Sequence, residues 1–160
     1  MFRQKFRQFL KYSLFLQDTK NRSMNDKTQH PSNTTYQGTL MDTLGITFTR
    51  LSPGRTEAVM PVEKRVCQPF GLLHGGATLA LAESVAGQGS LILCEPGEVA
   101  AGIQVSGNHV SSAKEGDTVH AIGTIIHQGR SMHVWNVDIF TSAGRLVSTV
   151  RVTNSILKRR

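Results

Sequence analysis

The chain has 160 residues, a hydrophobic fraction of 39% and a formal net charge of +7. This length suits one domain of roughly 100–150 residues with an extension. The sequence contains no apolar run of about 18 residues, so we expect no membrane-spanning helix. Most of the charge lies at the start, where residues 1–24 hold six basic side chains and one acidic one. The remainder is nearly balanced and carries no RNA-binding motif, so we expect no nucleic-acid partner.

Residues 1–37 are predicted to form a basic extension and a polar linker. The apolar residues of the first part recur at helical spacing, at Phe2, Phe6, Phe9, Leu10 and Leu14. This pattern fits a membrane-surface or targeting helix, a loosely ordered extension, or a true start at Met24. We favour the last two, and we expect no stable membrane association and a cytoplasmic location. Residues 18–37 are rich in Asn, Thr, Ser and Gln, which is typical of a linker.

The remaining residues, 38–160, are predicted to form one α+β domain. Turn signals follow residue 51, as Ser-Pro-Gly-Arg, and residue 94, as Glu-Pro-Gly. The order of elements is typical of a mostly antiparallel sheet of about five to six strands wrapped around one long central helix. The predicted elements are a short helix at 39–44, strands at 46–51 and 56–62, a long helix at 77–94, and strands at 99–110, 118–127, 133–141 and 146–157.

Glu83 lies in the middle of the long helix, which is apolar on nearly all sides and rich in small residues. Such a helix is expected to be buried deeply, with the sheet wrapped around it. A carboxylate in apolar surroundings costs free energy unless it is paired or protonated. We therefore interpret Glu83 as a candidate catalytic group with a raised pKa. The alternative interpretation is a surface glutamate on a single exposed stripe.

The long helix opens with His74, Gly75 and Gly76. Free backbone N–H groups and the positive end of the helix dipole lie at such a start, and glycine lets a ligand approach the backbone closely. This arrangement suits a polarised carbonyl or an oxyanion. Glu83 is about 12 Å further along the axis, at a rise of 1.5 Å per residue. One helix cannot place both groups on one carbonyl, so we predict an obligate homodimer with two composite sites.

The stretch from Gln68 to Ser84, QPFGLLHGGATLALAES, resembles the hotdog-fold thioesterases of the phenylacetate-degradation type. Within that group it is most similar to the 1,4-dihydroxy-2-naphthoyl-CoA hydrolases of menaquinone and phylloquinone synthesis. The likeness extends from about Thr39 to Leu157 and includes the segments 108–110, 113–116 and 127–135. It implies a hotdog fold, hydrolysis of an acyl-CoA to a free acid and CoA, homodimers that often form tetramers, and no cofactor or metal besides the CoA of the substrate.

The resemblance also implies roles for individual residues. Glu83 would be the catalytic carboxylate, acting as a nucleophile or as a general base on water. The Gly75 N–H would polarise the thioester carbonyl, and Gln68 and His74 would orient that carbonyl and shape the loop. CoA would lie along a set of residues that belongs partly to the neighbouring subunit: Gly102, His109, Val110, Ser111, Ser112, His127, Gly129, Arg130 and Ser131.

Two positions depart from these relatives. Many of them carry Ser or Thr one turn after the glutamate, where it can hold the attacking water, and here that residue is Gly87. Their basic residue after the Asn-His-Val motif is Ser111 here, a loss for which Lys114 or Arg130 could compensate. The sequence does not identify the acyl group. Besides an aromatic or fused-ring acyl-CoA, an aliphatic acyl-CoA, a carrier-protein thioester and a non-catalytic acyl-CoA-binding protein remain alternatives.

Other hydrolytic mechanisms find little support in the sequence. The six histidines show no metal-ligand spacing, and Ser84 lacks the Gly-x-Ser-x-Gly turn of serine hydrolases. Cys67 has no positioned histidine that would make it a nucleophile. Cys67 and Cys94 show no redox spacing, and two free thiols are favoured over a single disulfide.

Overall fold

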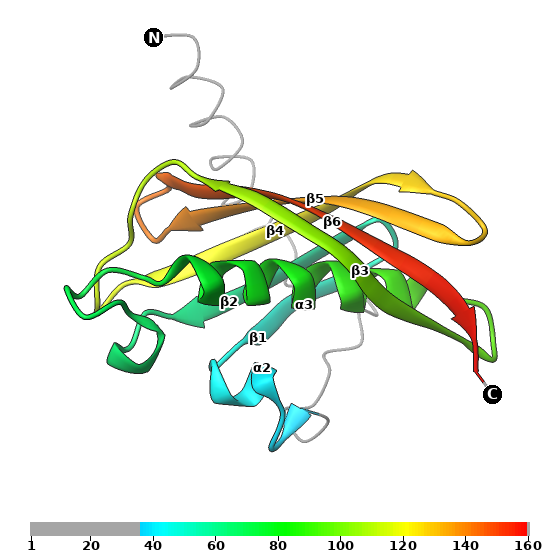
Figure 1. Cartoon of the computed structure of the whole chain (residues 1–160), viewed down its shortest axis with the longest axis horizontal. Helices are drawn as coiled ribbons and strands as arrows, with labels where there is room; N and C mark the ends of the chain where they lie inside the picture. The colour runs from blue at the N-terminus through cyan, green and yellow to red at the C-terminus, as the bar shows by residue number, and fades with distance from the viewer. Residues whose placement is uncertain (1–35, 160) are drawn as a thin grey trace, which may run out of the picture.

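The computed structural model describes residues 36–159, which form a six-stranded antiparallel sheet curled around one long helix (Figure 1). The predicted α+β class is confirmed, and the ends of the predicted elements agree within two residues. A short 3-10 helix, η2, was not predicted. The elements are α2 (Leu40–Thr43), β1 (Thr47–Ser52), β2 (Arg55–Pro61), η2 (Lys64–Val66), α3 (Gly75–Leu93), β3 (Glu98–His109), β4 (Thr118–Gln128), β5 (Met132–Thr141) and β6 (Leu146–Lys158).

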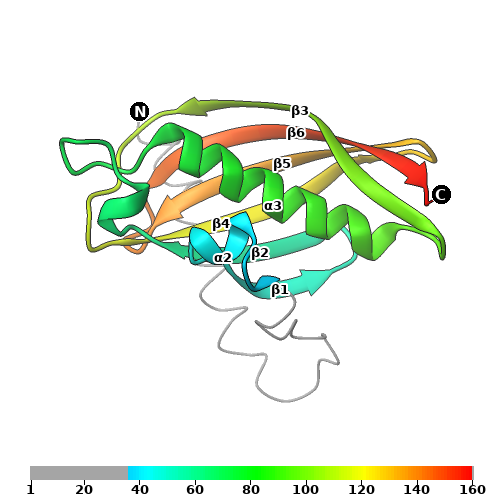
Figure 2. The ribbon, with the colours of Figure 1, turned by 60° about the horizontal axis from the view of Figure 1, so that its bottom comes forward.

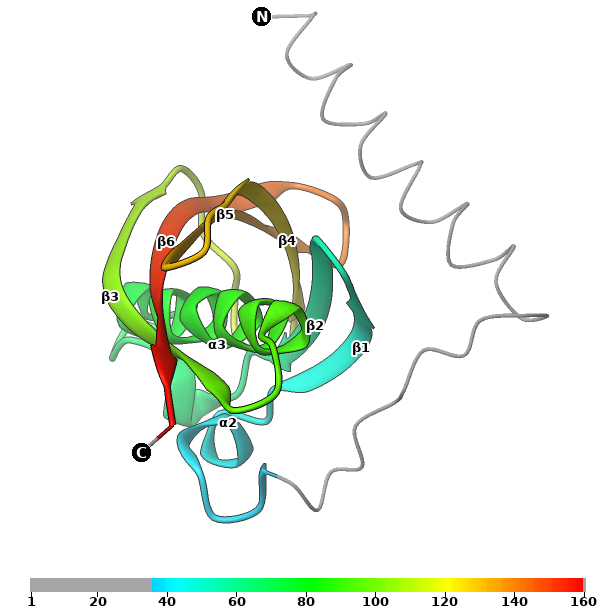
Figure 3. The ribbon, with the colours of Figure 1, turned by 90° about the vertical axis from the view of Figure 1, so that its right-hand side faces the viewer.

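The strands lie in the order β1-β2-β4-β5-β6-β3, and each neighbouring pair is antiparallel. Strand β3 directly follows α3 in the chain but pairs with β6, the last strand, so it forms one edge of the sheet. Figure 2 shows α3 running across the concave side of the sheet. In Figure 3 the sheet curls over α3, and α2 lies on the side of the helix that the sheet leaves open.

The helix α3 is held on the sheet by Trp135, which is fully buried. Gly89 lets the helix backbone approach the indole closely, because a Cβ at this position would lie 2.5 Å from Trp135 Cη2. The Trp135 Nε1 donates a hydrogen bond to Ser90 Oγ at 2.9 Å. Asn154 of β6 donates through Nδ2 to Ser90 Oγ at 2.9 Å and to the Ala86 carbonyl at 3.1 Å. These contacts fix both the rotation of α3 about its axis and its position along the sheet.

One face of α3 is open in the single chain, which differs from the all-round burial predicted from the sequence. Glu83 and Leu91 are exposed on the open face. The difference arises because the sheet curls around only one side of the helix, while alanine and glycine make the open side look apolar in the sequence. The buried face consists of Thr78, Leu81, Ala82, Val85, Ala86, Gly89 and Ser90.

The predicted extension, residues 1–37, lies outside the described residues except for Tyr36 and Gln37, and so does its amphipathic pattern. The Tyr36 ring packs against Phe48 of β1, with ring centroids 5.5 Å apart. Tyr36 therefore belongs to the packed structure. Within residues 36–159, no helix combines the length and apolar character needed to cross a membrane.

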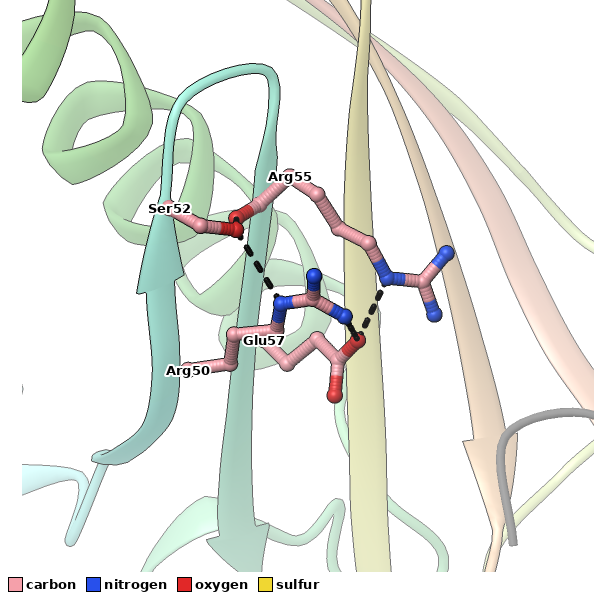
Figure 4. Close-up of polar contacts among 4 residues, drawn as sticks. All are labelled: Arg50, Ser52, Arg55 and Glu57. Atoms are coloured by element: carbon pink, nitrogen blue, oxygen red, sulfur yellow. Dashed lines mark hydrogen bonds and ion pairs between the residues drawn. The ribbon is translucent and has the colours of Figure 1, made fainter. Parts of the chain in front are cut away.

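The hairpin of β1 and β2 carries a buried carboxylate between two arginines (Figure 4). The side chain of Glu57 is 7% exposed, and its Oε1 lies 2.6 Å from Arg55 Nε and 3.6 Å from Arg50 Nη1. Arg50 Nε also donates to Ser52 Oγ at 3.0 Å. Because Thr56 faces α3 and strand side chains alternate, this cluster lies on the face of the hairpin turned away from the helix. A carboxylate this well buried depends on its ion pairs.

Replacing Glu57 by glutamine should destabilise the hairpin, because two partly buried guanidinium groups would lose their counter-charge. We expect the free energy of unfolding, measured by urea denaturation, to fall by about 1–3 kcal/mol. Glu63→Gln is the matched control, since Glu63 pairs with Arg65 at 3.0 Å while both side chains are 53% exposed. An exposed pair of this kind contributes at most about 1 kcal/mol, and equal losses in the two variants would contradict the prediction.

Candidate active site

The start of α3 presents a backbone donor. His74 is the N-cap of the helix, and its Nδ1 accepts a hydrogen bond from Gly76 N–H at 2.8 Å. The N–H of Gly75 has no acceptor among residues 36–159. The first N–H groups of a helix carry the positive end of its dipole. The Gly75 N–H can therefore receive a carbonyl oxygen.

His109, at the end of β3, packs directly on this helix start. A Cβ at Gly75 would lie 2.6 Å from His109 Nε2, so only glycine allows this approach. The other ring nitrogen, Nδ1, lies 2.7 Å from Ser148 Oγ, which holds the ring in place. Of the predicted site residues, the structure thus brings His74, Gly75 and His109 together at one end of α3.

The loop before α3 carries Gln68 and is held by several backbone hydrogen bonds. The Gln68 N–H donates to Leu72 O at 2.7 Å, and Gly71 N–H donates to Gln68 O at 2.9 Å. His74 N–H donates to Val66 O at 2.9 Å, which joins this loop to η2. The loop therefore holds Gln68 and His74 in one compact unit next to Gly75.

Cys67 does not have the surroundings of a nucleophile. Burial and, to a smaller extent, the negative charge of Glu115 raise the pKa of the Cys67 thiol, so the reactive thiolate is disfavoured. Both Cys67 and Cys94 are free. No group of three or more potential metal ligands occurs within the described part of the chain.

Glu83 lies on the open face of α3, beside a cavity of about 380 Å³. In the single chain the glutamate is exposed, which corresponds to the alternative interpretation of an exposed stripe. Among the described residues that line the cavity, Glu83 is the only ionisable one, and most of the others are apolar or small. They are Thr39, Leu40, Met41, Ala80, Ser84, Gly87, Gln88, Leu91 and Ala100.

The Glu83 carboxylate rests against Gly102 of β3. A Cβ at position 102 would lie 2.6 Å from Glu83 Oε1, so the observed side-chain position requires glycine there. The resemblance places Gly102 along CoA, whereas in this chain Gly102 borders the catalytic candidate. Glycine within a strand often marks such a close approach.

A second cavity of about 380 Å³ lies further toward the start of α3 and includes Cys67, His74 and Gly76 in its wall. Leu40 and Ala80 border both cavities. The short helix α2, which carries Leu40, therefore stands between the His74 end and the Glu83 end of one groove along the open face of α3.

The predicted CoA-binding residues do not form one group in the single chain. Residues 109–112 include the end of β3 and lie beside the start of α3, whereas residues 127–131 include the end of β4 and the β4–β5 turn at the other end of the molecule (Figure 1). In that turn, Gly129 N–H donates to Met132 O at 2.8 Å. The helix between the two groups has 19 residues, which corresponds to about 28 Å.

The two departures from the relatives are also visible. Gly87 lines the Glu83 cavity without a side chain, and Ser84 Oγ donates to the Ala80 carbonyl of its own helix at 2.8 Å. Ser111 Oγ donates to the Leu146 carbonyl. Sequence reasoning missed a nearby cation. Arg145 Nη2 donates to Ser112 O at 2.6 Å, and the two residues are 33 positions apart, so no local pattern indicates this contact.

Sequence reasoning also missed Asn154. This residue is buried on β6, opposite Gly102, and bonds to α3 three residues after Glu83. A single asparagine in an alternating strand gives no local sign of contact with a helix 68 residues away. Its partner on α3, Ser90, lies about two turns after Glu83 on the same side of the helix and is fully buried.

Comparison with known proteins identifies the family. Residues 70–148 match the profile of the Thioesterase superfamily. The chain is 39% identical over 121 residues to the 1,4-dihydroxy-2-naphthoyl-CoA hydrolase of Escherichia coli (strain K12), across 76% of this chain and 88% of the relative. The chain belongs to the thioesterase superfamily. It is also 38% identical over 125 residues to the proofreading thioesterase EntH of Cronobacter sakazakii, across 78% of this chain and 90% of the relative.

A solved thioesterase, SAV0944 from Staphylococcus aureus, has the same fold. Its structure superimposes with a TM-score of 0.71 at 36% identity and covers 73% of this chain and 97% of the other. That structure carries alanine in place of a glutamine, and a second structure of the same protein carries alanine in place of a glutamate. The two replaced residues are separated by the same number of positions as Gln68 and Glu83 here. The predicted hotdog fold and thioester hydrolase activity are confirmed.

Gly102→Ala should lower activity without unfolding the protein, because the new Cβ would push the Glu83 carboxylate aside. A displacement of about 1 Å at a reacting group can cost about a hundredfold in rate, and we expect at least a tenfold loss of kcat. Thioester hydrolysis and the melting temperature would be measured together. Glu83→Asp shortens the side chain and so relieves the contact with a Cβ at position 102. It should therefore cost less activity in the Gly102→Ala background than in the wild type. Additive losses of activity in the double variant would contradict the steric explanation.

Proposed function

We propose that this thioesterase hydrolyses an aromatic or fused-ring acyl-CoA, such as 1,4-dihydroxy-2-naphthoyl-CoA, to the free acid and CoA. The observation that carries the proposal is the Glu83 carboxylate in the wall of a mostly apolar cavity of about 380 Å³. Ligand pockets commonly have volumes of about 300–1,000 Å³ and few polar groups. The similarity to a 1,4-dihydroxy-2-naphthoyl-CoA hydrolase supports the fused-ring substrate.

In the proposed mechanism, the thioester carbonyl oxygen accepts a hydrogen bond from Gly75 N–H. The helix dipole adds a positive potential at the same point. Both effects are stronger when negative charge develops on the oxygen in the tetrahedral intermediate. Gln68 and His74, which lie on the hydrogen-bonded loop before α3, orient the carbonyl.

Glu83 supplies the group that starts the reaction. As a general base, it takes a proton from water while the water oxygen bonds to the carbonyl carbon. As a nucleophile, it forms an anhydride that water then hydrolyses. In both routes the carbon–sulfur bond breaks, CoA leaves as its thiolate, and the thiolate is protonated. Carbonyl polarisation by Gly75 assists either route.

A homodimer would bring Glu83 of one subunit to Gly75 of the other. The two residues lie about 12 Å apart along a single α3. Strand β3 offers a free edge, on which Ile103 is 59% exposed, and Val110, directly after the strand, is 58% exposed. A two-fold axis through the middle of β3 would pair two copies of this edge and set the two α3 helices antiparallel, which supports two composite sites.

The same axis would unite the two groups of predicted CoA-binding residues. Residues 109–112 of one subunit would approach residues 127–131 of its partner, because the strand ends that carry them exchange places across the axis. The exposed side chains of Lys114, Arg130 and Arg145 offer positive charge at these two ends of the molecule. CoA phosphates bind well to such groups.

The similarity to a proofreading thioesterase favours a second candidate, hydrolysis of an acyl group held as a thioester on a carrier protein. The two candidates share the Glu83 chemistry and differ in what carries the acyl group. A carrier-protein thioester would be hydrolysed faster than the matching acyl-CoA at equal concentration.

A substrate panel tests the proposed function. We expect the highest kcat/KM for naphthoyl- and benzoyl-CoA, lower values for phenylacetyl- and fatty-acyl-CoA, and a loss of at least about a hundredfold in Glu83→Gln. A thiol-release assay measures all of these, and carrier-linked benzoyl thioester is measured beside them. A higher kcat/KM on fatty-acyl-CoA would overturn the aromatic assignment, and full activity of Glu83→Gln would overturn the role of the glutamate.

The composite site predicts that activity depends on the dimer. Ile103→Lys would place a charge on the free edge and should shift the protein to monomers in sedimentation velocity, with loss of hydrolysis. Thr124→Lys is the control, because this exposed residue lies on β4, which is paired on both sides. Monomers of Ile103→Lys that keep wild-type kcat would show that one chain contains a complete site.

A further inference from the structure

Asn154 has a fixed orientation in the interior. The residue is 1% exposed and pairs with Gly102 across β6 and β3. Its Nδ2 donates to the Ala86 carbonyl at 3.1 Å and to Ser90 Oγ at 2.9 Å. A carbonyl oxygen only accepts hydrogen bonds, so the nitrogen of the carboxamide must face Ala86. The Oδ1 of Asn154 therefore occupies the other side of the group.

The Oδ1 of Asn154 faces the Glu83 carboxylate across Gly102. Glu83 Oε1 and Asn154 Oδ1 lie 2.6 Å and 3.7 Å from the same point, the position of a Cβ on Gly102, so they are within about 6 Å of each other. Asn154 Oδ1 is buried and has no hydrogen-bond donor among the described residues. A buried amide oxygen without a donor is rare and calls for a ligand that supplies one.

Water matches this pair of oxygens. Both oxygens accept, and a water molecule has two hydrogens, so it can donate one to Glu83 and one to Asn154. Its lone pairs then point away from both groups, toward an incoming acyl carbon. Held by Glu83 alone, the water would rotate about a single hydrogen bond. Gly87 has no side chain to hold it, and the Ser84 hydroxyl donates to the Ala80 carbonyl.

We propose that Asn154 is a catalytic residue that holds the hydrolytic water together with Glu83. The proposal rests on the proposed function, with Glu83 as general base. The water oxygen bonds to the thioester carbon while its proton passes to Glu83, and the proton toward Asn154 stays on the new acid. The carbon–sulfur bond then breaks, and the CoA thiolate takes the proton from Glu83. The products are one carboxylic acid and one thiol.

The competing explanation is that Asn154 only fixes α3 on the sheet. Its Nδ2 has this role, and Ser90 shares it through the bond to Trp135. Asn154→Ala removes both Oδ1 and the two Nδ2 hydrogen bonds. Ser90→Ala is the matched control, because it also removes two buried hydrogen bonds but leaves Oδ1 and its anchor at Ala86 in place.

The test compares steady-state hydrolysis of benzoyl-CoA by the full-length wild type, Asn154→Ala and Ser90→Ala. We expect kcat of Asn154→Ala to fall about ten- to a hundredfold with KM within about twofold of the wild type, since the water is activated but the substrate is not bound by Asn154. Ser90→Ala should keep kcat within about threefold. Equal kcat losses in the two variants, or a change confined to KM, would overturn the proposal.

A crystal structure of the wild-type dimer with an unreactive benzoyl-CoA thioether keeps the proposal testable if Asn154→Ala does not fold. A water within hydrogen-bond distance of both Asn154 Oδ1 and Glu83 supports it, and a Glu83 carboxylate that binds its water without Asn154 overturns it. The proposed function fails separately, when the wild type hydrolyses no acyl-CoA. The proposal for Asn154 fails when the wild type is active and Asn154→Ala matches Ser90→Ala.

Discussion

The contact between α3 and Trp135 determines the rest of the structure. The helix carries Gly75 at its start and Glu83 at its middle, so its rotation on the sheet decides where both groups point. Gly89 brings the helix backbone onto the indole, and the hydrogen bonds of Ser90 and Asn154 hold the helix in one register. The same contacts set the rotation of α3 so that Glu83 points toward Gly102 and away from the core. A loosely packed helix would lose this geometry even if every catalytic residue were retained.

The open face of α3 is what the proposed composite sites require. If the sheet covered the helix on all sides, neither Glu83 nor Gly75 could meet a second subunit in the proposed dimer. The sheet instead covers one side, α2 covers part of the other, and the groove between them leads from His74 to Glu83. The apolar character of this groove suits an acyl group, while the rim at each end of the molecule carries the exposed cations.

The sequence was sufficient to predict the elements, because glycine and proline turns separate runs of clear periodicity. The positions of Gln68, His74 and Gly75 before and at the start of α3 were also predicted from the sequence, since they lie in one contiguous motif, while their roles stay predictions. The exposure of Glu83 in the single chain was not the interpretation favoured from the sequence. The apolar residues of a helix do not reveal whether they face the sheet of their own chain or an open groove. The contacts of Gly102 and Asn154 could not be predicted, because strands far apart in the sequence form them.

Strand β3 follows α3 in the chain but pairs with β6 in the sheet, and this has a consequence for folding. Strand β3 finds its neighbour only when β6, the last strand, has been made, so the wall behind Glu83 is completed late. Contacts between such distant segments form slowly, since the intervening chain must first be ordered. Until β6 has been synthesised, β5 and β3 therefore lack their shared neighbour. Unpaired strand edges of this kind favour association with other chains. Strand β6 then joins β5 to β3 and completes the strand pairing behind Glu83, and β3 is left as an edge of the finished sheet.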